Sequence, residues 1–331
     1  MDEANVSDLD SSLVSAVVAR QQQLRPQLFG SGDAQSVLEG LHAVGKDASG
    51  TLRPTLAGLL AMGTYPQFFF PRLNVTFASY PSDSKSVILN GTERLLDSKS
   101  LVGPIPSLVQ EATSLVLRNA RIAGHMEGVF RTEVPDYPLL AVREAVTNAL
   151  MHRDYSHLAR GTQVQVNLFI DHLEILNPGG LYGTVTLAKL GSRGLSSARN
   201  QRLSTLLEEV SYPEGGIVAE NRGTGYLLIE AQLAEAGMAP PEADDDISSF
   251  SLIFRRFPQR QTPSARPVAP SQQVIEAYLT SKQIASTTDL MEVTGLSRSA
   301  VTKHLRILQA SGRIETIHPT RSKFQQYRWL G

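Results

Sequence analysis

The chain has 331 residues, 41% of them hydrophobic and 19% charged, with a formal net charge of −1. This length suffices for two or three domains, and the composition is that of an ordinary globular protein. The absence of cysteine excludes disulfides and thiolate metal sites, and the seven histidines lack the spacing of zinc ligands. No apolar stretch is long enough for a transmembrane helix, and the acidic start of the chain is unlike a signal peptide, so we expect a cytoplasmic protein.

The first part of the chain, residues 1–134, mixes the patterns of helices and strands. Apolar residues predict helices near residues 13–18 and 52–61 and a longer amphipathic helix at 105–122. The segment 74–80 alternates between apolar and polar residues, which predicts a strand. We therefore expect an N-terminal α/β region.

The second part, residues 135–257, combines predicted helices and strands with two glycine-rich segments. The predicted elements are a helix from about Pro138, strands near 162–170 and 173–175, a helix from about Gly225 and a strand at 248–255. The first of these helices has an apolar face that we expect to point at a core, formed by Leu139, Val142, Val146, Ala149 and Leu150.

The polar side of this helix is the most informative feature of the chain. Glu144, Asn148 and His152 fall within one narrow arc, because successive helical residues turn by about 100°. A carboxylate one turn from a carboxamide suits a magnesium nucleotide. The amide oxygen can ligate the metal, and the carboxylate can hold or activate a water.

Two glycine-rich segments follow along the chain. Residues 177–180 come directly after a predicted strand, and residues 223–225 open an apolar helix. Glycines at the start of a helix let a phosphate approach the free backbone N–H groups. Each segment alone has a structural alternative, which is a simple turn for the first and a loop into a packed helix for the second.

Residues 258–270 contain four prolines among thirteen residues and little to bury, which predicts a semi-stiff, extended linker. The last part, 271–331, carries eight Lys or Arg and four Asp or Glu, a net charge of +4, so residues 1–270 carry −5. A basic module on an acidic body indicates a polyanion partner for the tail, although chance clustering would give the same count.

Residues 271–331 follow the pattern of a winged helix-turn-helix. The predicted elements are helices at 272–279, 287–294 and 298–310 and strands at 313–318 and 324–329, which flank a basic tip. In such a module the third helix enters the major groove and the wing touches phosphate. The expected DNA contacts are Arg298, Ser299, Thr302, Lys303, Arg306, Arg321 and Lys323. The alternative is a winged helix used for protein contact or dimerisation.

The order of the motifs in the second part resembles the GHKL ATP-binding fold of histidine kinases and gyrase B subunits. The chain is more closely similar to bacterial RecG-related regulators, which carry a GHKL-like domain of the HATPase_c_4 type, and this resemblance extends over roughly residues 35–255. The segments that carry it are 59–71, 143–155, 177–181, 197–200 and 222–225. The chain contains no helicase P-loop, Gly-x-x-x-x-Gly-Lys-Ser/Thr.

The resemblance implies a role for each matching residue. Asn148 would ligate Mg²⁺, and Glu144 would act as a general base or position the water. The other nucleotide-binding residues would be His152 and Arg153 near the phosphates, Asn177, Gly179 and Gly180 on the adenine and ribose side, Gly223, Thr224 and Gly225 on the phosphates, and Arg199 and Asn200 in or near a lid. The residues alone leave an alternative for His152 and Arg153, which also fit a helix C-terminus stabilised by basic side chains.

Two departures from the family pattern matter. Full-length relatives begin with a Schlafen-type AlbA domain, and this chain is expected to start after it. The GHKL fold has an Asp before the first glycine turn to accept the adenine amino group, whereas this chain has Asn177. An amide oxygen can still accept that bond, but without the assistance of charge. We therefore expect weak nucleotide binding, a vestigial pocket or a different ligand.

The sequence thus predicts an α+β protein with an N-terminal α/β region (1–134), a GHKL-like α/β-sandwich body (135–257), the linker and a C-terminal winged helix-turn-helix. The expected function is that of a DNA-binding transcription regulator whose body binds ATP and Mg²⁺, or a related ligand, and which acts as a homodimer on double-stranded DNA. One alternative is an active ATPase or kinase-type enzyme, at most a slow Mg-dependent ATPase, whose winged helix docks a partner. The other is a regulator with a vestigial nucleotide pocket.

Overall fold

The structure is a computed structural model that describes residues 3–86, 95–120, 122–127, 130–192, 197–220, 223–256, 271–310, 312–317 and 325–330. The proline-rich segment 258–270 and the basic tip 319–323, which includes Arg321 and Lys323, lie outside the described residues. The side chains of Ser299 and Lys303 also lie outside the description. The chain divides into two compact units, Met1–Phe257 and Pro258–Gly331.

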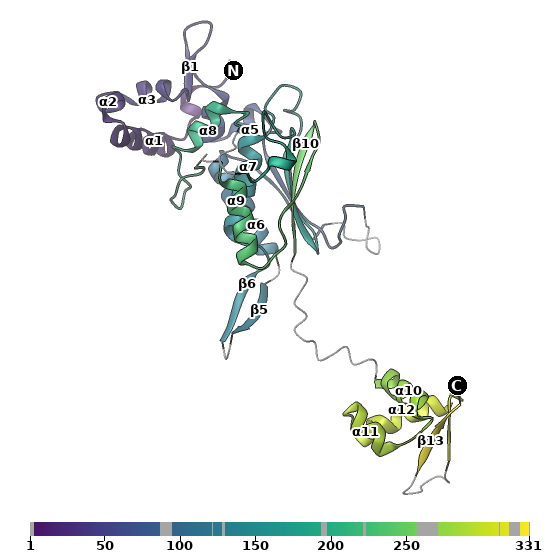
Figure 1. The fold of residues 1–331 in the computed structure, drawn as a ribbon. Coiled ribbons are helices and arrows are strands. Elements are labelled where there is room, and N and C mark those ends of the chain that lie inside the picture. Colours follow the sequence, from purple (N-terminus) through teal and green to yellow (C-terminus); the bar gives the residue numbers. More distant parts are fainter. Residues whose placement is uncertain are drawn as a thin grey trace. The chain divides into compact units, whose positions relative to one another are not determined.

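The first unit is a mixed α+β body built on a six-stranded sheet (Figure 1). The strands lie in the order β4 (Asp97–Leu101), β3 (Val75–Ser79), β7 (Val164–Leu168), β8 (His172–Pro178), β10 (Ser249–Arg255) and β9 (Glu242–Asp245). β3 and β7 are parallel, and all other neighbours in this sheet are antiparallel. Helices α6 (Ile105–Asn119) and α7 (Leu139–His152) pack against the sheet, and α9 (Gly225–Glu235) packs against α7.

Helix α7 is held in the body by a face of small and aliphatic side chains. Its buried apolar residues are Ala141, Val142, Ala145, Val146, Ala149, Leu150 and Met151. Leu139, which the sequence predicted on this face, lies in the first turn and remains 47% exposed. The buried face is therefore shifted toward the two alanines at 141 and 145, and the opposite arc with Glu144 and Asn148 is left free to line a cavity.

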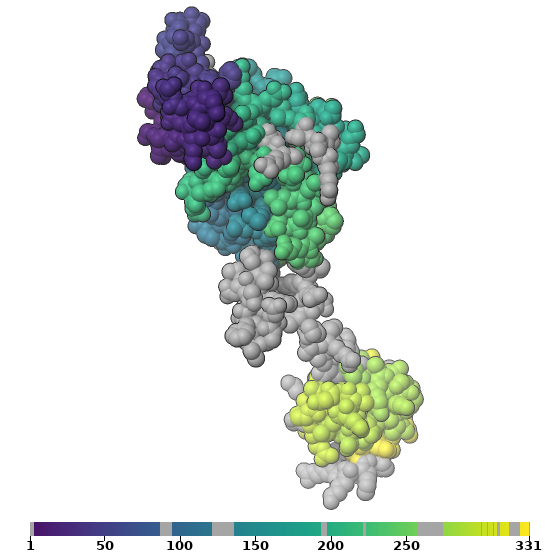
Figure 2. Space-filling model, turned by 60° about the vertical axis from the view of Figure 1, so that its left-hand side comes forward, coloured from purple at the N-terminus to yellow at the C-terminus, as the bar shows by residue number. Residues whose placement is uncertain are grey.

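The N-terminal region packs on the rest of the body, as the purple part of Figure 2 shows. Its elements are α1 (Ser11–Leu24), α2 (Pro26–Phe29), α3 (Ala34–Gly40), β1 (Val44–Lys46), β2 (Leu52–Pro54), α4 (Leu56–Met62) and α5 (Pro66–Phe69). Residues 52–54 form a strand paired with β1, whereas the sequence pattern predicted a helix over all of 52–61. The reason is Pro54, which disfavours helical geometry in the residue before it, and Thr55, whose hydroxyl caps α4 by accepting from Gly58 N at 3.0 Å.

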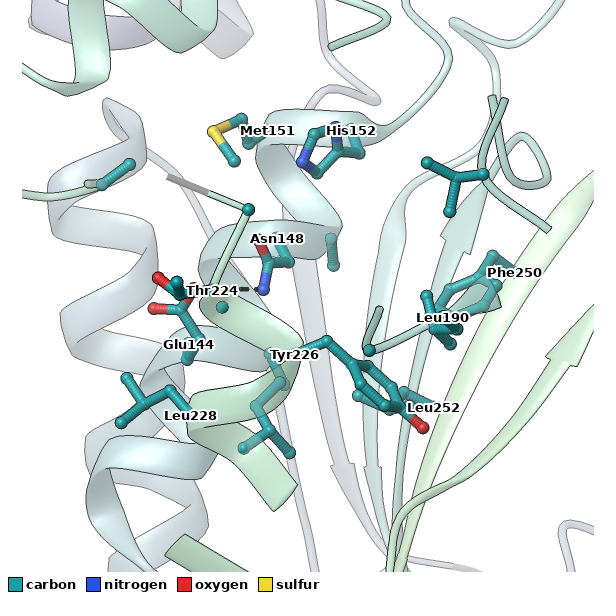
Figure 3. Close-up of a pocket in the computed structure, with 18 of the residues that line it drawn as sticks. Glu144, Asn148, Met151, His152, Leu190, Thr224, Tyr226, Leu228, Phe250 and Leu252 are labelled. Atoms are coloured by element: carbon teal, nitrogen blue, oxygen red, sulfur yellow. Dashed lines mark hydrogen bonds between the residues drawn. The ribbon is translucent and has the colours of Figure 1, made fainter. Parts of the chain in front are cut away.

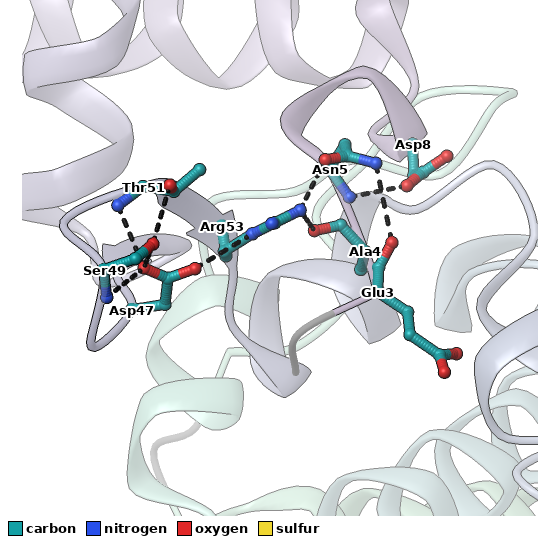
Figure 4. Close-up of polar contacts among 8 residues, drawn as sticks. All are labelled: Glu3, Ala4, Asn5, Asp8, Asp47, Ser49, Thr51 and Arg53. Carbon is teal, nitrogen blue, oxygen red and sulfur yellow. Dashed lines mark hydrogen bonds and ion pairs between the residues drawn. The ribbon is translucent and has the colours of Figure 1, made fainter.

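A polar cluster around Arg53 ties the start of the chain to the β1–β2 hairpin (Figure 4). Arg53 Nη1 donates to Ala4 O at 3.2 Å and to Asn5 Oδ1, while its Nε donates to Asp47 Oδ2 at 3.2 Å. Asp47 also accepts from backbone and side chains of the turn, and these hydrogen bonds, led by the Ser49 hydroxyl, lower its pKa to about 2. The turn therefore keeps an ionised carboxylate that holds Arg53 in place.

A buried carboxylate links α1 to the region after α8 (Gln201–Leu207). Glu209 is 5% exposed, and its two oxygens lie 3.3 Å from Arg20 Nε and 2.9 Å from Arg25 Nη2. Both arginines are about one-third to one-half exposed, so they remain partly hydrated while the carboxylate is not. This pairing positions α1 on the body.

Two further differences from the sequence prediction lie between α6 and α7. The predicted helix at 105–122 ends at Asn119, because Ala120 is extended (φ −67°, ψ 145°). The chain then forms β5 (Ile122–Glu127) and β6 (Phe130–Pro135), which pair antiparallel in a separate two-stranded sheet. The two strands are consecutive in the chain and stabilise each other by backbone pairing, which the periodicity of their side chains did not reveal.

In the part of the second unit that the structure describes, the chain forms three helices and a three-stranded antiparallel sheet. The elements are α10 (Ser271–Lys282), β11 (Ile284–Ser286), α11 (Thr287–Thr294), α12 (Arg298–Ala310), β12 (Ile314–Thr316) and β13 (Gln326–Trp329), with β13 central in the sheet. Their core is separate from that of the body and includes Ile275, Leu279, Leu290, Val301, Leu305 and Leu308. Gly295 ends α11 in the left-handed conformation (φ 67°), which favours glycine and sets the turn into α12.

Candidate functional site

A cavity of about 260 Å³ lies in the body (Figure 3). It is lined by α7, α9, β8 and β10, and by residues between 180 and 197 and between 217 and 224. Of the residues predicted to bind nucleotide, the cavity is lined by Glu144, Asn148, His152, Asn177, Gly180, Gly223, Thr224 and Gly225. Arg153, Gly179, Arg199 and Asn200 do not line it. The pocket therefore brings together one arc of α7, the end of β8 and the start of α9.

One end of the pocket is polar and is formed by α7 facing the start of α9. Asn148 Nδ2 donates to Glu144 Oε1 at 3.2 Å, which leaves the amide oxygen of Asn148 available to another partner. Burial raises the pKa of Glu144, although the Asn148 hydrogen bond opposes this, and the nearby charge of Glu220 adds to the rise. The carboxyl group is thus poised to exchange a proton closer to neutral pH than an exposed glutamate would be.

The N-terminus of α9 approaches this pair because its first residue is glycine. A Cβ added to Gly225 would lie 2.2 Å from Glu144 Oε1 and 2.9 Å from Asn148 Nδ2, so no side chain fits without displacing them. Thr224 precedes the helix and makes no side-chain capping hydrogen bond. The first N–H groups of an uncapped helix, together with the helix dipole, favour a bound anion at this position.

The other end of the pocket is largely apolar. Its walls are Ile175, Leu190, Tyr226, Phe250 and Leu252, and Figure 3 shows Leu190, Phe250 and Leu252 gathered on the side away from Glu144. Asn177 lines the same region and is only 5% exposed. Its Nδ2 lies 3.5 Å from Pro178 O and 3.4 Å from Gly179 O, which are weak hydrogen bonds. A flat, apolar group with a polar edge would fit here.

His152 lies at the end of α7 and lines the pocket (Figure 3). Burial, and secondarily the positive charge of Arg199, lowers its pKa from 6.5 to about 4. The imidazole is therefore neutral at physiological pH. It can accept or donate a hydrogen bond but cannot neutralise an anionic ligand.

Arg153 lies in the interior of the body, away from the pocket that the resemblance suggested. Its side chain is fully buried and donates to Ala159 O at 3.1 Å and Thr162 O at 2.7 Å, and it stacks over the Tyr155 ring at 4.9 Å. These backbone acceptors belong to the loop between α7 and β7. The guanidinium thus fixes that loop and is not available to a ligand in the pocket.

Sequence reasoning missed six charged or aromatic residues that line the pocket: Arg143, Tyr182, Lys189, Glu220, Tyr226 and Phe250. Arg143 lies on α7 with its guanidinium 5.4 Å from the centre of the Tyr212 ring. Lys189 and Glu220 lie in segments without a periodic pattern, so no signal in the sequence marks them. Tyr226 directly follows Gly225, and its proximity to the glycine-rich segment was the only available hint.

The residues at the polar end are suited to a hard cation held jointly with a ligand. Glu144 and Asn148 offer oxygen donors, which Mg²⁺ prefers. Among the described residues no group of three or more His, Cys, Asp or Glu could hold a metal by itself. Mg²⁺ commonly takes one or two protein oxygens and completes its shell with phosphate oxygens and waters. These residues therefore fit a magnesium nucleotide better than a free structural metal.

The second unit presents a separate basic surface on α12. Arg298 and Arg306 are exposed, whereas Arg313 and Arg328 are paired within the unit, with Glu276 at 2.9 Å and Glu315 at 2.9 Å. Thr302 is partly buried, and its hydroxyl donates to Arg298 O at 2.7 Å, which leaves its oxygen free to accept. The remaining predicted DNA contacts lie outside the described side chains.

Three comparisons place these observations among known proteins. Residues 161–254 match the family model HATPase_c_4, described as "Putative ATP-dependent DNA helicase recG C-terminal". The crystal structure of the DIP2311 protein from Corynebacterium diphtheriae is similar to 99% of this chain, with 18% sequence identity and a TM-score of 0.52. At this identity the similarity concerns the fold alone. The chain spans about 63% of the length of that protein.

No curated protein matches the chain significantly. Within the described residues, no helix is both long and apolar enough to cross a membrane. The match covers β7, β8, α9 and β10, so this part of the chain is similar to the RecG-related, ATPase-like domain family.

Proposed function

We propose that the chain is a ligand-responsive transcription regulator. In this proposal a magnesium nucleotide such as ATP binds the pocket of the body, and the second unit binds double-stranded DNA as a winged helix-turn-helix. The observation that carries the proposal is the convergence of a carboxylate, a carboxamide and an uncapped helix N-terminus opposite an apolar slot. The family match over residues 161–254 supports the nucleotide-binding part.

A nucleotide suits the pocket because its two ends require opposite environments. Its phosphates would lie at the N-terminus of α9, where backbone N–H groups and the helix dipole favour negative charge. Mg²⁺ would be held by the amide oxygen of Asn148 and would neutralise the phosphate charge. The base would lie against the apolar walls, with Asn177 as the hydrogen-bonding partner of its polar edge.

An active enzyme is the second candidate function, and Glu144 is the observation that favours it. A half-buried carboxylate with a raised pKa suits a general base for an attacking water. Arg153 and Arg199 make their contacts within the protein, so they would not stabilise a phosphoryl-transfer transition state. We therefore expect turnover, if present, to be slow.

The DNA-binding part of the proposal rests on α12 and its charges. A three-helix unit with a small antiparallel sheet is the arrangement of winged helix-turn-helix proteins, in which the third helix enters the major groove. The exposed Arg298 and Arg306 would contact DNA from that helix. Such proteins commonly bind as two-fold dimers to palindromic sites, so we propose a homodimer.

Calorimetric titration of Mg-ATP into the full chain, with phosphate release measured alongside, tests the nucleotide site. Wild-type protein should bind, and Asn148→Ala should weaken binding because it removes the metal ligand. Gln35→Ala serves as a matched control, since it removes an exposed amide on α3. Equal ATP affinity in wild type and Asn148→Ala would refute the site, and rapid phosphate release would favour the enzyme.

Coupling between the units tests the regulator itself. Saturating nucleotide should change DNA affinity by about 5- to 150-fold, and DNA should change nucleotide affinity by the same factor. Replacement of residues 258–270 by a Gly/Ser run of equal length should preserve both binding activities and reduce the coupling. Unchanged DNA affinity in the presence of nucleotide would leave the body as a separate enzyme or a scaffold.

A further inference from the structure

Arg199 lies beside the pocket and joins two elements that form its walls. Its Nη2 donates to Gly180 O at 2.8 Å, its Nη1 lies 3.5 Å from Asp154 Oδ2, and its Cζ lies 5.0 Å from the centre of the Tyr182 ring. Gly180 and Tyr182 line the pocket, whereas Arg199 does not. Its Nε is buried without a hydrogen-bond partner, a cost that the contacts of the two Nη atoms offset.

Neighbouring hydrogen bonds hold the same junction. Asp154 N, just after α7, donates to Pro178 O at the end of β8 at 2.7 Å. Asn200 Nδ2 donates to Met151 O and Arg153 O, both at 2.9 Å, so it satisfies carbonyls at the C-terminal end of α7. Two consecutive residues, 199 and 200, therefore connect the end of α7 to the turn that follows β8.

The turn at Gly179 and Gly180 is itself tightly packed against these residues. Gly179 has a φ of +90°, which favours glycine. A Cβ added there would lie 2.7 Å from Asp154 Cβ and 3.1 Å from Arg199 Nη1. The backbone of the turn is therefore packed directly against both members of the ion pair, and a change in either member would shift the turn.

The two walls carry different parts of the proposed nucleotide site. Glu144, Asn148 and His152 lie on α7, and Asn177 lies at the end of β8. The distance between the polar end and the base end of the pocket therefore depends on how α7 and β8 are joined. The side chain of Arg199 connects the two, because it contacts Gly180 after β8 and Asp154 after α7.

We infer that Arg199 is a positioning residue, which holds the Gly179–Gly180 turn against the end of α7 and so sets the affinity of the pocket for the whole nucleotide without touching its phosphates. The inference rests on the proposed nucleotide-binding function. A planar guanidinium suits this role, because it binds a carbonyl, pairs with a carboxylate and stacks on a ring at the same time. A lysine ammonium would keep the charge but could not make all three contacts.

The test compares Arg199→Lys and Arg199→Gln with wild type in the full chain, using Mg-ATP and adenosine as probes in calorimetry. Arg202→Gln is the matched control, because it removes an exposed arginine three residues further along. We expect both Arg199 variants to weaken ATP and adenosine by the same factor. This factor should be roughly 10- to 100-fold, as for residues that orient direct ligands of a site.

A direct phosphate contact would give a different result, and it would overturn the inference. Arg199→Lys would then retain most of the affinity, and Arg199→Gln would weaken ATP but not adenosine. If the wild type binds no nucleotide, the proposed function fails. The positioning role of Arg199 is then tested by hydrogen exchange of the ligand-free protein. The Asp154 amide should exchange at least about tenfold faster in both Arg199 variants and not in Arg202→Gln. Unchanged exchange would refute the role.

Discussion

The neutral imidazole of His152 predicts how the stability of the body depends on pH. Its pKa is lowered to about 4 in the folded protein, first by burial and then by the charge of Arg199, whereas the ordinary value is 6.5. Between these values the unfolded chain binds a proton that the folded chain does not. The free energy of unfolding therefore falls as the pH is lowered from 6.5 to 4, and this contribution is fully present above pH 6.5.

The size of the effect follows from the lowered pKa. A shift from 6.5 to about 4 corresponds to a loss of about 3 kcal/mol at most, a large share of the stability of a typical domain. The raised pKa of Glu144 acts in the opposite direction, because its folded carboxyl group takes up a proton more readily than the unfolded one. The comparison must therefore isolate His152 by substitution.

Urea unfolding of the full chain at pH 7, 6, 5 and 4 provides the assay, with wild type, His152→Gln and the exposed-histidine control His157→Gln. The single tryptophan, Trp329, belongs to the second unit, so near-ultraviolet circular dichroism of the tyrosines should be used to follow the body. His152→Gln cannot take up the proton and should lose about 3 kcal/mol less than wild type between pH 7 and pH 4. Parallel pH profiles for wild type and His152→Gln would refute the reasoning.

Three further outcomes are expected. Gly225→Ala should weaken Mg-ATP by about tenfold or more, because the new Cβ would displace the Glu144 carboxylate, while Gly161→Ala, which meets no atom within 4 Å, should bind normally in calorimetry. Glu209→Gln should lower the free energy of unfolding by about 1–3 kcal/mol in urea titrations, since it leaves a buried amide between two arginines. Replacing Arg298 and Arg306 together by Ala should weaken DNA binding in gel shifts and make it less sensitive to salt, and an unchanged salt slope would exclude phosphate contacts.

The sequence predicted the pocket best where a local pattern carries the chemistry. The spacing of Glu144, Asn148 and His152 puts them on one arc of a helix, and all three line the cavity. The glycine-rich start of α9 was equally visible, because only glycine permits the approach of Gly225 to Glu144. In both cases a short stretch of chain contains the whole reason for the geometry.

The rest depends on contacts between distant segments, which periodicity does not encode. The side chain of Arg153 is held by carbonyls in the loop that follows it. It therefore does not line the pocket, although the adjacent residue His152 does. Lys189 and Glu220 line the pocket from segments with no regular pattern. The short strands β4, β9 and β11 are stabilised by their sheet partners, and their own residues gave no strand signal.

The placement of cations bears on the choice between a sensor and an enzyme. Phosphoryl transfer is accelerated by positive groups that contact the transferred phosphate in the transition state. Among the described residues, the cations that line the pocket are Arg143, which stacks on Tyr212, and Lys189. Arg199 instead contributes to the join between α7 and β8. Because Arg199 makes these contacts and does not line the pocket, it adds no cation next to a bound ligand. This favours the proposed ligand-binding role over rapid turnover, since a long-lived bound state suits a regulator of DNA binding.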